Sequence, residues 1–325
     1  MDNAIQRYRE AEQKLWREAG ANPTEQFVRL PRHDVTVRIQ EVGQGSPVLF
    51  VHGNPSAGST WAPLVARLSG LRCLLVDRPG TGLSGAYTYD RKSIREFFET
   101  LVVDVLDALE IDQAHLVGSS SGSDFVLWAG ARHQHRVLRS VHFGCPGFAP
   151  GIHIALSERL IAVPGLWRLA ARMFPTSVNG MRYMMKHLGH GASLEAGGIS
   201  QGVLEWFSAL YKDTPTLYHE LQGASIMFSL RGFQPWLLPT AEDFAAITSP
   251  SCFFWGEQDN YGGVSIGHRM AELMPNASVQ ALPEGGHLPW LDDPEKAAGV
   301  ARKHLCAEEP AVSLSANASR SESAS

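Results

Sequence analysis

The chain has 325 residues, of which 44% are hydrophobic and 9% aromatic, so it can bury the core of one α/β domain that carries an insertion. A net charge of −5 and the lack of any Lys/Arg-rich block argue against nucleic acid as a partner. Residues 1–20 are charged throughout and contain no apolar signal region, and no apolar run approaches the roughly 18 residues of a membrane span. We therefore expect a cytoplasmic protein without a membrane span, and the sequence leaves open whether it forms a homodimer.

The four cysteines are far apart and show no CxxC spacing; they are Cys73, Cys145, Cys252 and Cys306. Three of them fall in or beside apolar, strand-like runs, which favours buried thiols in a reducing compartment over metal ligands. No other metal-ligand spacing is present. We expect neither a metal nor a cofactor.

The first predicted element is a helix over residues 4–19, where apolar side chains recur at steps of three and four. Eight alternating or apolar runs bounded by turn residues then predict strands, over residues 26–30, 35–42, 47–53, 73–80, 115–120, 138–144, 251–256 and 278–283. Helix-length stretches separate most of these runs from residue 58 onward. A short antiparallel start followed by strand–helix alternation predicts an α/β fold, with a mostly parallel eight-stranded sheet flanked by helices.

The alternation breaks between about residues 146 and 246, a segment without a comparable strand-like run that holds five of the eight methionines and many aromatic residues. We expect a helical insertion there, after the sixth strand. The predicted units are an N-terminal helix over 1–25, a core over 26–145 and 247–306, the insertion over 146–246, and a Ser/Ala/Glu-rich tail over 307–325 that is expected to be disordered.

The first chemical motif is the run from Gly118 to Gly122, Gly-Ser-Ser-Ser-Gly, which follows a predicted strand and precedes a helical run. A sharp strand-to-helix turn can lift one serine above the edge of the sheet, and it needs small residues two positions to either side because backbone crowds there. The glycine frame selects Ser120 among the three serines. Because the motif also arises by chance, the flanking strand and helix carry this assignment.

A serine hydroxyl needs a base to take its proton. Among 13 histidines, His287 stands out by its context, because it follows the last predicted strand and a Gly-Gly pair and precedes the helical run that closes the domain. The other histidines look structural or exposed. The insertion holds His187, His190 and His219, and a contact of one of them with substrate stays open.

A carboxylate should orient this histidine, and the candidate is Asp259, in the turn after the predicted strand 251–256. Glu257 is the rival, two residues earlier, and we expect its side chain to point to solvent. The other place for an acid, after the sixth strand, is residues 142–148, which contain no carboxylate.

An oxyanion hole requires two backbone N–H groups directed at the developing charge. We expect one from Ser121, the residue after the nucleophile, and the other from Asn54, in the loop after the third predicted strand. Pro55 has no N–H to donate, but it stiffens that loop.

Together these motifs resemble the α/β-hydrolase fold family over about residues 26–306. The resemblance rests on HGNP (52–55), DRPGTGLS (77–84), GSSSG (118–122), WGEQD (255–259) and GGH (285–287), in the family's order of nucleophile, acid and histidine. It implies that Ser120, Asp259 and His287 form a catalytic triad. It also implies that Asn54 and Ser121 form the oxyanion hole and that the insertion 146–246 is a cap over the site. It also implies that Asp77 and residues 80–84 fix the turn after the fourth strand.

One departure from that pattern concerns the nucleophile. His-Gly-x-Pro after the third strand resembles the haloalkane dehalogenase and epoxide hydrolase branch, which uses an aspartate nucleophile. Here the elbow position is Ser120 and the GSSSG frame holds no acid, so an alkyl-enzyme ester route is ruled out.

The leading functional hypothesis is hydrolysis of an ester or related acyl bond of a small apolar substrate through an acyl-enzyme. Carbon–carbon bond hydrolysis, a lyase reaction and acyl transfer on the same triad remain alternatives. A non-catalytic ligand-binding protein would not need the triad. We expect the aromatic and methionine side chains of the insertion to line a closed apolar pocket in part; they are Trp167, Met173, Phe174, Met181, Tyr183, Met184, Met185, Trp206, Phe207, Tyr211, Met227, Phe228, Phe233 and Trp236.

Overall fold

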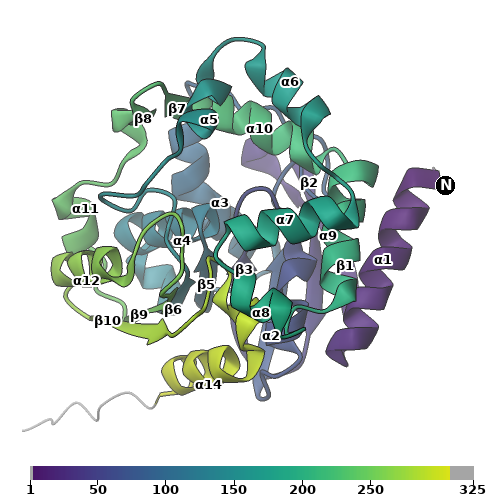
Figure 1. Cartoon of the computed structure of the whole chain (residues 1–325). Coiled ribbons are helices and arrows are strands. Elements are labelled where there is room, and N and C mark those ends of the chain that lie inside the picture. Colours follow the sequence, from purple (N-terminus) through teal and green to yellow (C-terminus); the bar gives the residue numbers. More distant parts are fainter. Residues whose placement is uncertain (1–2, 308–325) are drawn as a thin grey trace, which may run out of the picture.

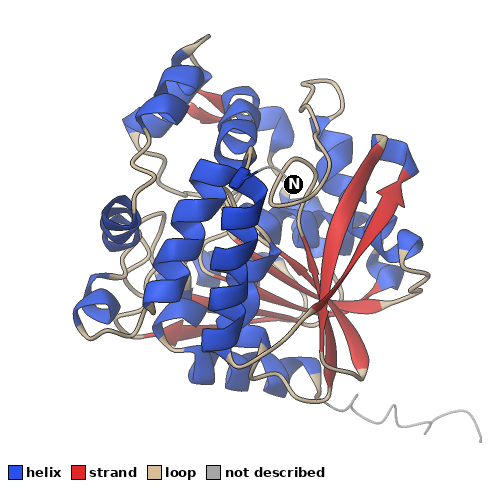
Figure 2. Ribbon diagram, turned by 90° about the vertical axis from the view of Figure 1, so that its right-hand side faces the viewer, coloured by secondary structure: helices blue, strands red, loops and turns tan. Residues whose placement is uncertain are grey.

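The computed structural model describes residues 3–307 and contains the predicted eight-stranded, mostly parallel sheet with helices on both faces (Figures 1 and 2). The strand order is β1-β2-β4-β3-β5-β6-β9-β10. β1 pairs antiparallel with β2 and β2 antiparallel with β4, whereas all later pairs are parallel. The strands are β1 (Thr24–Leu30), β2 (Val35–Val42), β3 (Ser46–Val51), β4 (Leu71–Val76), β5 (Ala114–Ser119), β6 (Val137–Phe143), β9 (Ser251–Gly256) and β10 (Ala277–Leu282).

The central strands are buried on both faces, which explains why they are continuous apolar runs in the sequence. In β3, Val48 and Phe50 belong to one core cluster, while Leu49 and Val51 belong to the cluster on the opposite face. The first cluster packs against α2 (Ala62–Val65) and α14 (Pro294–Leu305), and the second against α3 (Ile94–Ala108) and α4 (Ser121–Arg132). α12 (Val264–Leu273) covers alternate residues of β9.

The segment between β6 and β9 is largely helical and lies over one end of the sheet in Figure 1. Its helices are α5 (Leu156–Arg159), α6 (Leu166–Met173), α7 (Val178–His187), α8 (Gly191–Glu195), α9 (Gln201–Asp213), α10 (Thr216–Met227) and α11 (Ala241–Ala245). It also contains a small hairpin of β7 (Phe228–Ser229) and β8 (Gly232–Phe233), which the sequence analysis did not predict. Two-residue strands are too short to show alternation.

The N-terminal helix α1 (Asn3–Ala19) lies beside α9 (Figure 1). Lys14 forms an ion pair with Glu205 of α9, with 2.6 Å between Nζ and Oε2. On the side of α1 that faces the sheet, Glu12 is buried, and its carboxylate accepts a hydrogen bond from the Arg38 guanidinium of β2 at 2.6 Å. α1 therefore connects the insertion to the sheet.

Among residues 3–307, no helix is both long and apolar enough to cross a membrane. Cys73, Cys145 and Cys252 are buried and Cys306 is exposed. Burial raises the pKa of the Cys73 thiol to about 12. The predicted disordered tail over 307–325 lies, after its first residue, outside the described part of the chain.

Candidate active site

The predicted nucleophile Ser120 lies at the turn between β5 and α4. Its backbone has φ 49° and ψ −128°, a conformation that L residues rarely adopt and that is characteristic of a strained nucleophile elbow. Steric crowding explains why glycine occupies both flanking positions. A Cβ at Gly122 would collide with the Val51 carbonyl oxygen, and one at Gly118 would lie 2.7 Å from the Ser123 Cα.

Asp259 and His287 lie together at the same end of the sheet. His287 Nδ1 is 2.9 Å from Asp259 Oδ2, and both residues are buried, with 4% and 6% of their surface exposed. Asp259 also accepts from two backbone amides, those of Cys145 at 2.8 Å and Tyr261 at 2.9 Å. Glu257, the rival acid, is exposed as expected.

The insertion fixes the loop that carries His287. The backbone N–H of His287 donates to the Leu188 carbonyl oxygen at 2.8 Å. His190 is fully buried, and its Nδ1 lies 2.9 Å from the Asp292 carboxylate, which accepts from the Gly286 N–H at 2.8 Å. Of the three insertion histidines considered above, His190 therefore has a positioning contact rather than a place in the two cavities that contain Ser120, whereas His187 lines the cavity that contains His287.

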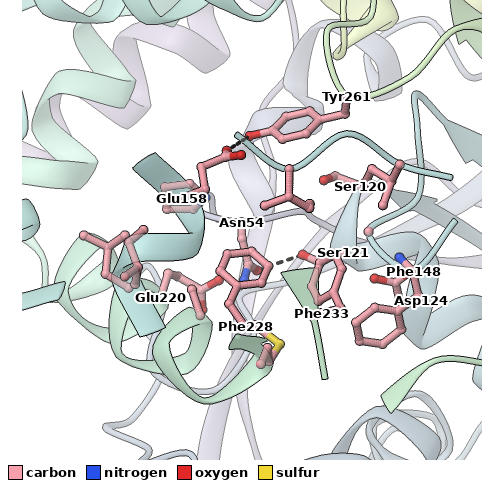
Figure 3. A pocket seen from close by; sticks show the side chains of 18 residues that line it. Asn54, Ser120, Ser121, Asp124, Phe148, Glu158, Glu220, Phe228, Phe233 and Tyr261 are labelled. Carbon is pink, nitrogen blue, oxygen red and sulfur yellow. Dashed lines mark hydrogen bonds between the residues drawn. The ribbon is translucent and has the colours of Figure 1, made fainter. Parts of the chain in front are cut away.

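The predicted oxyanion-hole residues Asn54 and Ser121 are adjacent. Ser121 Oγ donates to Asn54 Oδ1 at 2.8 Å, as Figure 3 shows. Within the described chain, neither backbone N–H has an acceptor, so both are free to bind a substrate oxygen. Ser121 also begins α4, whose N-terminal dipole favours negative charge at this point.

An ion pair that the sequence did not indicate supports this loop. Arg78 Nη2 donates to the Gly53 carbonyl oxygen at 3.2 Å and also to Asn54 Oδ1, and it contacts Glu220 Oε2 of α10 at 2.7 Å. Both charged side chains are 1% exposed. Burial alone would raise the pKa of Glu220, but the charge of Arg78 and a hydrogen bond from His219 outweigh it and lower that pKa to about 2.

We expect Glu220→Gln to destabilise the protein by about 3–5 kcal/mol at neutral pH, because it leaves the Arg78 guanidinium buried without a counter-ion. The folded-state pKa of about 2 lies below the ordinary value of 4.5, so the contribution of the pair is complete above about pH 4.5 and is lost as the pH falls toward 2. Urea unfolding of parent and variant at neutral pH and near pH 3.5 should show the difference shrinking in acid. The exposed Glu257→Gln variant is the matched control, and equal stability of parent and Glu220→Gln at neutral pH would contradict the role given to the pair.

Two cavities share Ser120 in their lining. The smaller has a volume of about 140 Å³ and extends from Ser120 toward Asp124 and the hairpin. The larger, of about 250 Å³, contains His287 as well. Glu158 and Tyr261 line both, and the Tyr261 hydroxyl donates to Glu158 at 2.7 Å (Figure 3).

About half of the aromatic and methionine side chains singled out in the insertion line these cavities. They are Phe174, Met184, Phe207 and Tyr211 in the larger cavity and Met227, Phe228 and Phe233 in the smaller one. Others, such as Met181 and Trp206, are fully buried elsewhere in the core, and Met173 and Tyr183 are exposed. The pocket that we expected to be apolar also contains carboxyl groups of the insertion, because Glu158 lines both cavities and Glu220 lines the smaller one.

No group of three or more His, Cys, Asp or Glu side chains among residues 3–307 is arranged to hold a metal ion. The polar residues of the smaller cavity that the sequence analysis missed are Asp124, Glu158, Glu220 and Tyr261. Only Asp124 had a usable signal, since it follows the predicted nucleophile by one helical turn.

Residues 46–294 match the family model described as the alpha/beta hydrolase fold. A 2-hydroxy-6-oxononadienedioate/2-hydroxy-6-oxononatrienedioate hydrolase from Cupriavidus pinatubonensis is 26% identical over 275 residues, which cover 81% of this chain and 89% of that protein. The carboxylesterase CesB from Bacillus subtilis has a similar structure, with a TM-score of 0.71, 21% identity and coverage of 93% of this chain and 98% of that one.

A meta-cleavage product hydrolase from Pseudomonas fluorescens is also similar in structure, with a TM-score of 0.65, 22% identity and coverage of 86% of this chain and 96% of that one. At these identities the two structures support the shared fold. The family match spans most of the chain and includes the elbow, the acid turn and the histidine loop described above. The chain belongs to the α/β-hydrolase fold family.

Proposed function

We propose that the protein is a serine hydrolase that cleaves a carbon–carbon bond next to a ketone carbonyl, with Ser120 as nucleophile, His287 as general base and acid, and Asp259 orienting His287. The observation that carries the proposal is the relative aligned with 81% of the chain, named for a 6-oxo-dienedioate substrate. Such a compound contains a ketone and carboxylates but no ester, so its hydrolysis must break a carbon–carbon bond. The sequence analysis placed ester hydrolysis first, and the relatives favour the alternative that it kept open.

The roles proposed for these residues give the following reaction. Ser120 Oγ adds to the ketone carbon while His287 takes its proton, and the N–H groups of Asn54 and Ser121 bind the oxyanion. Collapse of the adduct breaks the carbon–carbon bond, and the leaving carbon takes the proton from His287. Water then hydrolyses the ester on Ser120, so that one water yields a carboxylic acid and a C–H product. The leaving carbon needs a second carbonyl, directly or through conjugation, to hold the electron pair.

Ester hydrolysis remains the second candidate, because the cavities lack, among residues 3–307, the cationic side chains that would bind a carboxylate-bearing ketone. No Lys or Arg side chain lines either cavity in the described part of the chain, although a carboxylate-bearing substrate would favour one. An uncharged ester or an uncharged diketone could bind in these cavities without a charge that lacks a counter-ion.

Three substrates distinguish the candidates: the dienedioate named for the relative, uncharged 1-phenyl-1,3-butanedione, and p-nitrophenyl butanoate. We expect kcat/KM on at least one ketone to exceed that on the ester by tenfold or more, with oxygen from labelled water entering the acid product. A lyase would leave the product unlabelled, and an acyltransferase would form a methyl ester when methanol is added. Cleavage of the ester alone, abolished in Ser120→Ala, would replace this proposal by ester hydrolysis.

A cytoplasmic location belongs to the same proposal, and the three buried thiols are compatible with a reducing compartment. Cell fractionation checks the location, and light scattering of the purified chain checks the homodimer that the sequence left open.

A further inference from the structure

Asp124 is a buried carboxyl group in the smaller cavity, one helical turn after Ser120 on α4. Its exposure is 0%. Oδ1 accepts from the Phe148 backbone N–H at 2.9 Å, whereas Oδ2 has no hydrogen-bond partner among the described residues. Figure 3 labels Asp124 and Phe148. A Cβ at position 147 would collide with Oδ2, so Gly147 leaves this oxygen its space. A ligand in the smaller cavity can supply the hydrogen-bond partner that Oδ2 lacks.

The free oxygen is a hydrogen-bond donor. Burial raises the pKa of Asp124 well above its usual range and outweighs the Phe148 hydrogen bond and the charge of Arg78, which lower it. A charged carboxylate with 0% exposure, no ion pair among the described residues and one oxygen without a partner would be strongly disfavoured, so this geometry favours the protonated acid. Because Oδ1 accepts from a backbone N–H, the proton lies on Oδ2, the oxygen without a partner.

The remainder of the smaller cavity disfavours a charged ligand. Phe148, Phe228 and Phe233 form apolar walls, and Figure 3 places Glu158 and Glu220 across the cavity from Asp124. Since no Lys or Arg side chain lines this cavity in the described chain, a carboxylate bound there would be desolvated without a counter-charge.

The two cavities divide the substrate at the reacting carbonyl. The leaving group takes its proton from His287, which lines the larger cavity and does not line the smaller one. The leaving group therefore occupies the larger cavity, and the acyl group that stays on Ser120 occupies the smaller cavity with Asp124.

We propose that Asp124 is a specificity-determining residue that donates a hydrogen bond to an uncharged oxygen, such as an ether, hydroxyl or carbonyl oxygen, on the acyl group of the substrate, and that the cavity excludes acyl groups ending in a carboxylate. The inference rests on the roles proposed above for Ser120 and His287. It applies equally to a ketone and to an ester, because both leave the acyl group on Ser120. It therefore predicts that this chain cleaves the uncharged diketone faster than the dienedioate named for the relative, whose acyl group ends in a carboxylate.

The test uses four p-nitrophenyl esters with acyl chains of similar length. The reference ester is the hexanoate. In 4-methoxybutanoate and 3-ethoxypropanoate an ether oxygen replaces one methylene of that chain, and the glutarate monoester ends in a carboxylate. In the parent, we expect kcat/KM for at least one ether ester to exceed that for hexanoate by roughly tenfold, because the buried donor is then satisfied. The glutarate ester should fall at least tenfold below hexanoate.

Two variants assign the preference to the side chain. Asp124→Leu should reduce the ether-to-hexanoate ratio to about one, whereas Asp124→Asn should retain most of it, since its amide can accept from Phe148 and donate to the ligand. Glu158→Gln, which alters another carboxyl group of the cavity, is the matched control and should leave the ratio unchanged.

An ether preference that persists in Asp124→Leu, its absence in the parent, or a glutarate ester cleaved as well as hexanoate would overturn the inference. The parent comparison decides even where the Leu variant does not fold. Failure of the proposed function gives a different result, namely no Ser120-dependent turnover of any ester or ketone and no labelling of Ser120 by a fluorophosphonate.

Discussion

Replacement of Ser120 by alanine is expected to reduce kcat by on the order of 10⁴-fold or more and to leave the fold intact, because it removes the atom that we propose attacks the carbonyl. Alanine and serine tolerate the positive φ of 49° about equally, so the elbow should keep its shape. The measurement is kcat on the best substrate of the panel, together with circular dichroism melting and labelling by a fluorophosphonate probe.

The neighbouring serines provide matched controls for this variant. Ser119 is buried and lies before the turn, so Ser119→Ala should retain most of the activity. Ser121→Ala keeps the backbone N–H proposed for the oxyanion hole and loses only the hydrogen bond to Asn54, so a smaller decrease is expected. A Ser120→Ala enzyme that works within tenfold of the parent would show that the nucleophile is another residue.

The sheet could be predicted from the sequence because its signal is local. Each central strand packs against helices on both faces, so residues such as Val48 and Leu49 are apolar in succession, and each run ends at turn residues. The helix expected after β3 is shorter than its apolar pattern, with a 3₁₀ turn over Gly58–Trp61 followed by the four residues of α2. Packing of Trp61 in the core, which the pattern does not specify, accompanies this tight turn.

The polar network of the site could not be predicted in the same way. Arg78 and Glu220 are 142 positions apart, and the sequence carries no sign that they meet. His190 and Asp292 are 102 positions apart. For Asp124, the position after the elbow was visible, but burial and the missing partner of Oδ2 depend on Gly147 and Phe148, which come from the other side of β6 in the sequence. Such properties arise from tertiary packing.

The second large effect on kcat/KM is expected from Asp259, which is buried, and not from Glu257, which is exposed. Asp259→Asn should lower kcat/KM at least about 10²-fold, and Glu257→Gln should change it by less than twofold. The Asp259 carboxylate is buried beside His287. In the proposed mechanism, its negative charge stabilises the imidazolium that forms when Ser120 loses its proton. Glu257 is exposed, so water screens its charge from the site.

An amide at position 259 also cannot satisfy its surroundings. Oδ2 lies 2.8 Å from the Cys145 N–H and 2.9 Å from His287 Nδ1, and Oδ1 lies 2.9 Å from the Tyr261 N–H. If the amide nitrogen takes the Oδ2 position, it faces the Cys145 N–H and holds His287 in the wrong tautomer. If it takes the Oδ1 position, it opposes the Tyr261 N–H, and the imidazolium still lacks a counter-charge. Steady-state kinetics of the two variants decide the assignment, because a large loss in Glu257→Gln with little change in Asp259→Asn would identify Glu257 as the acid.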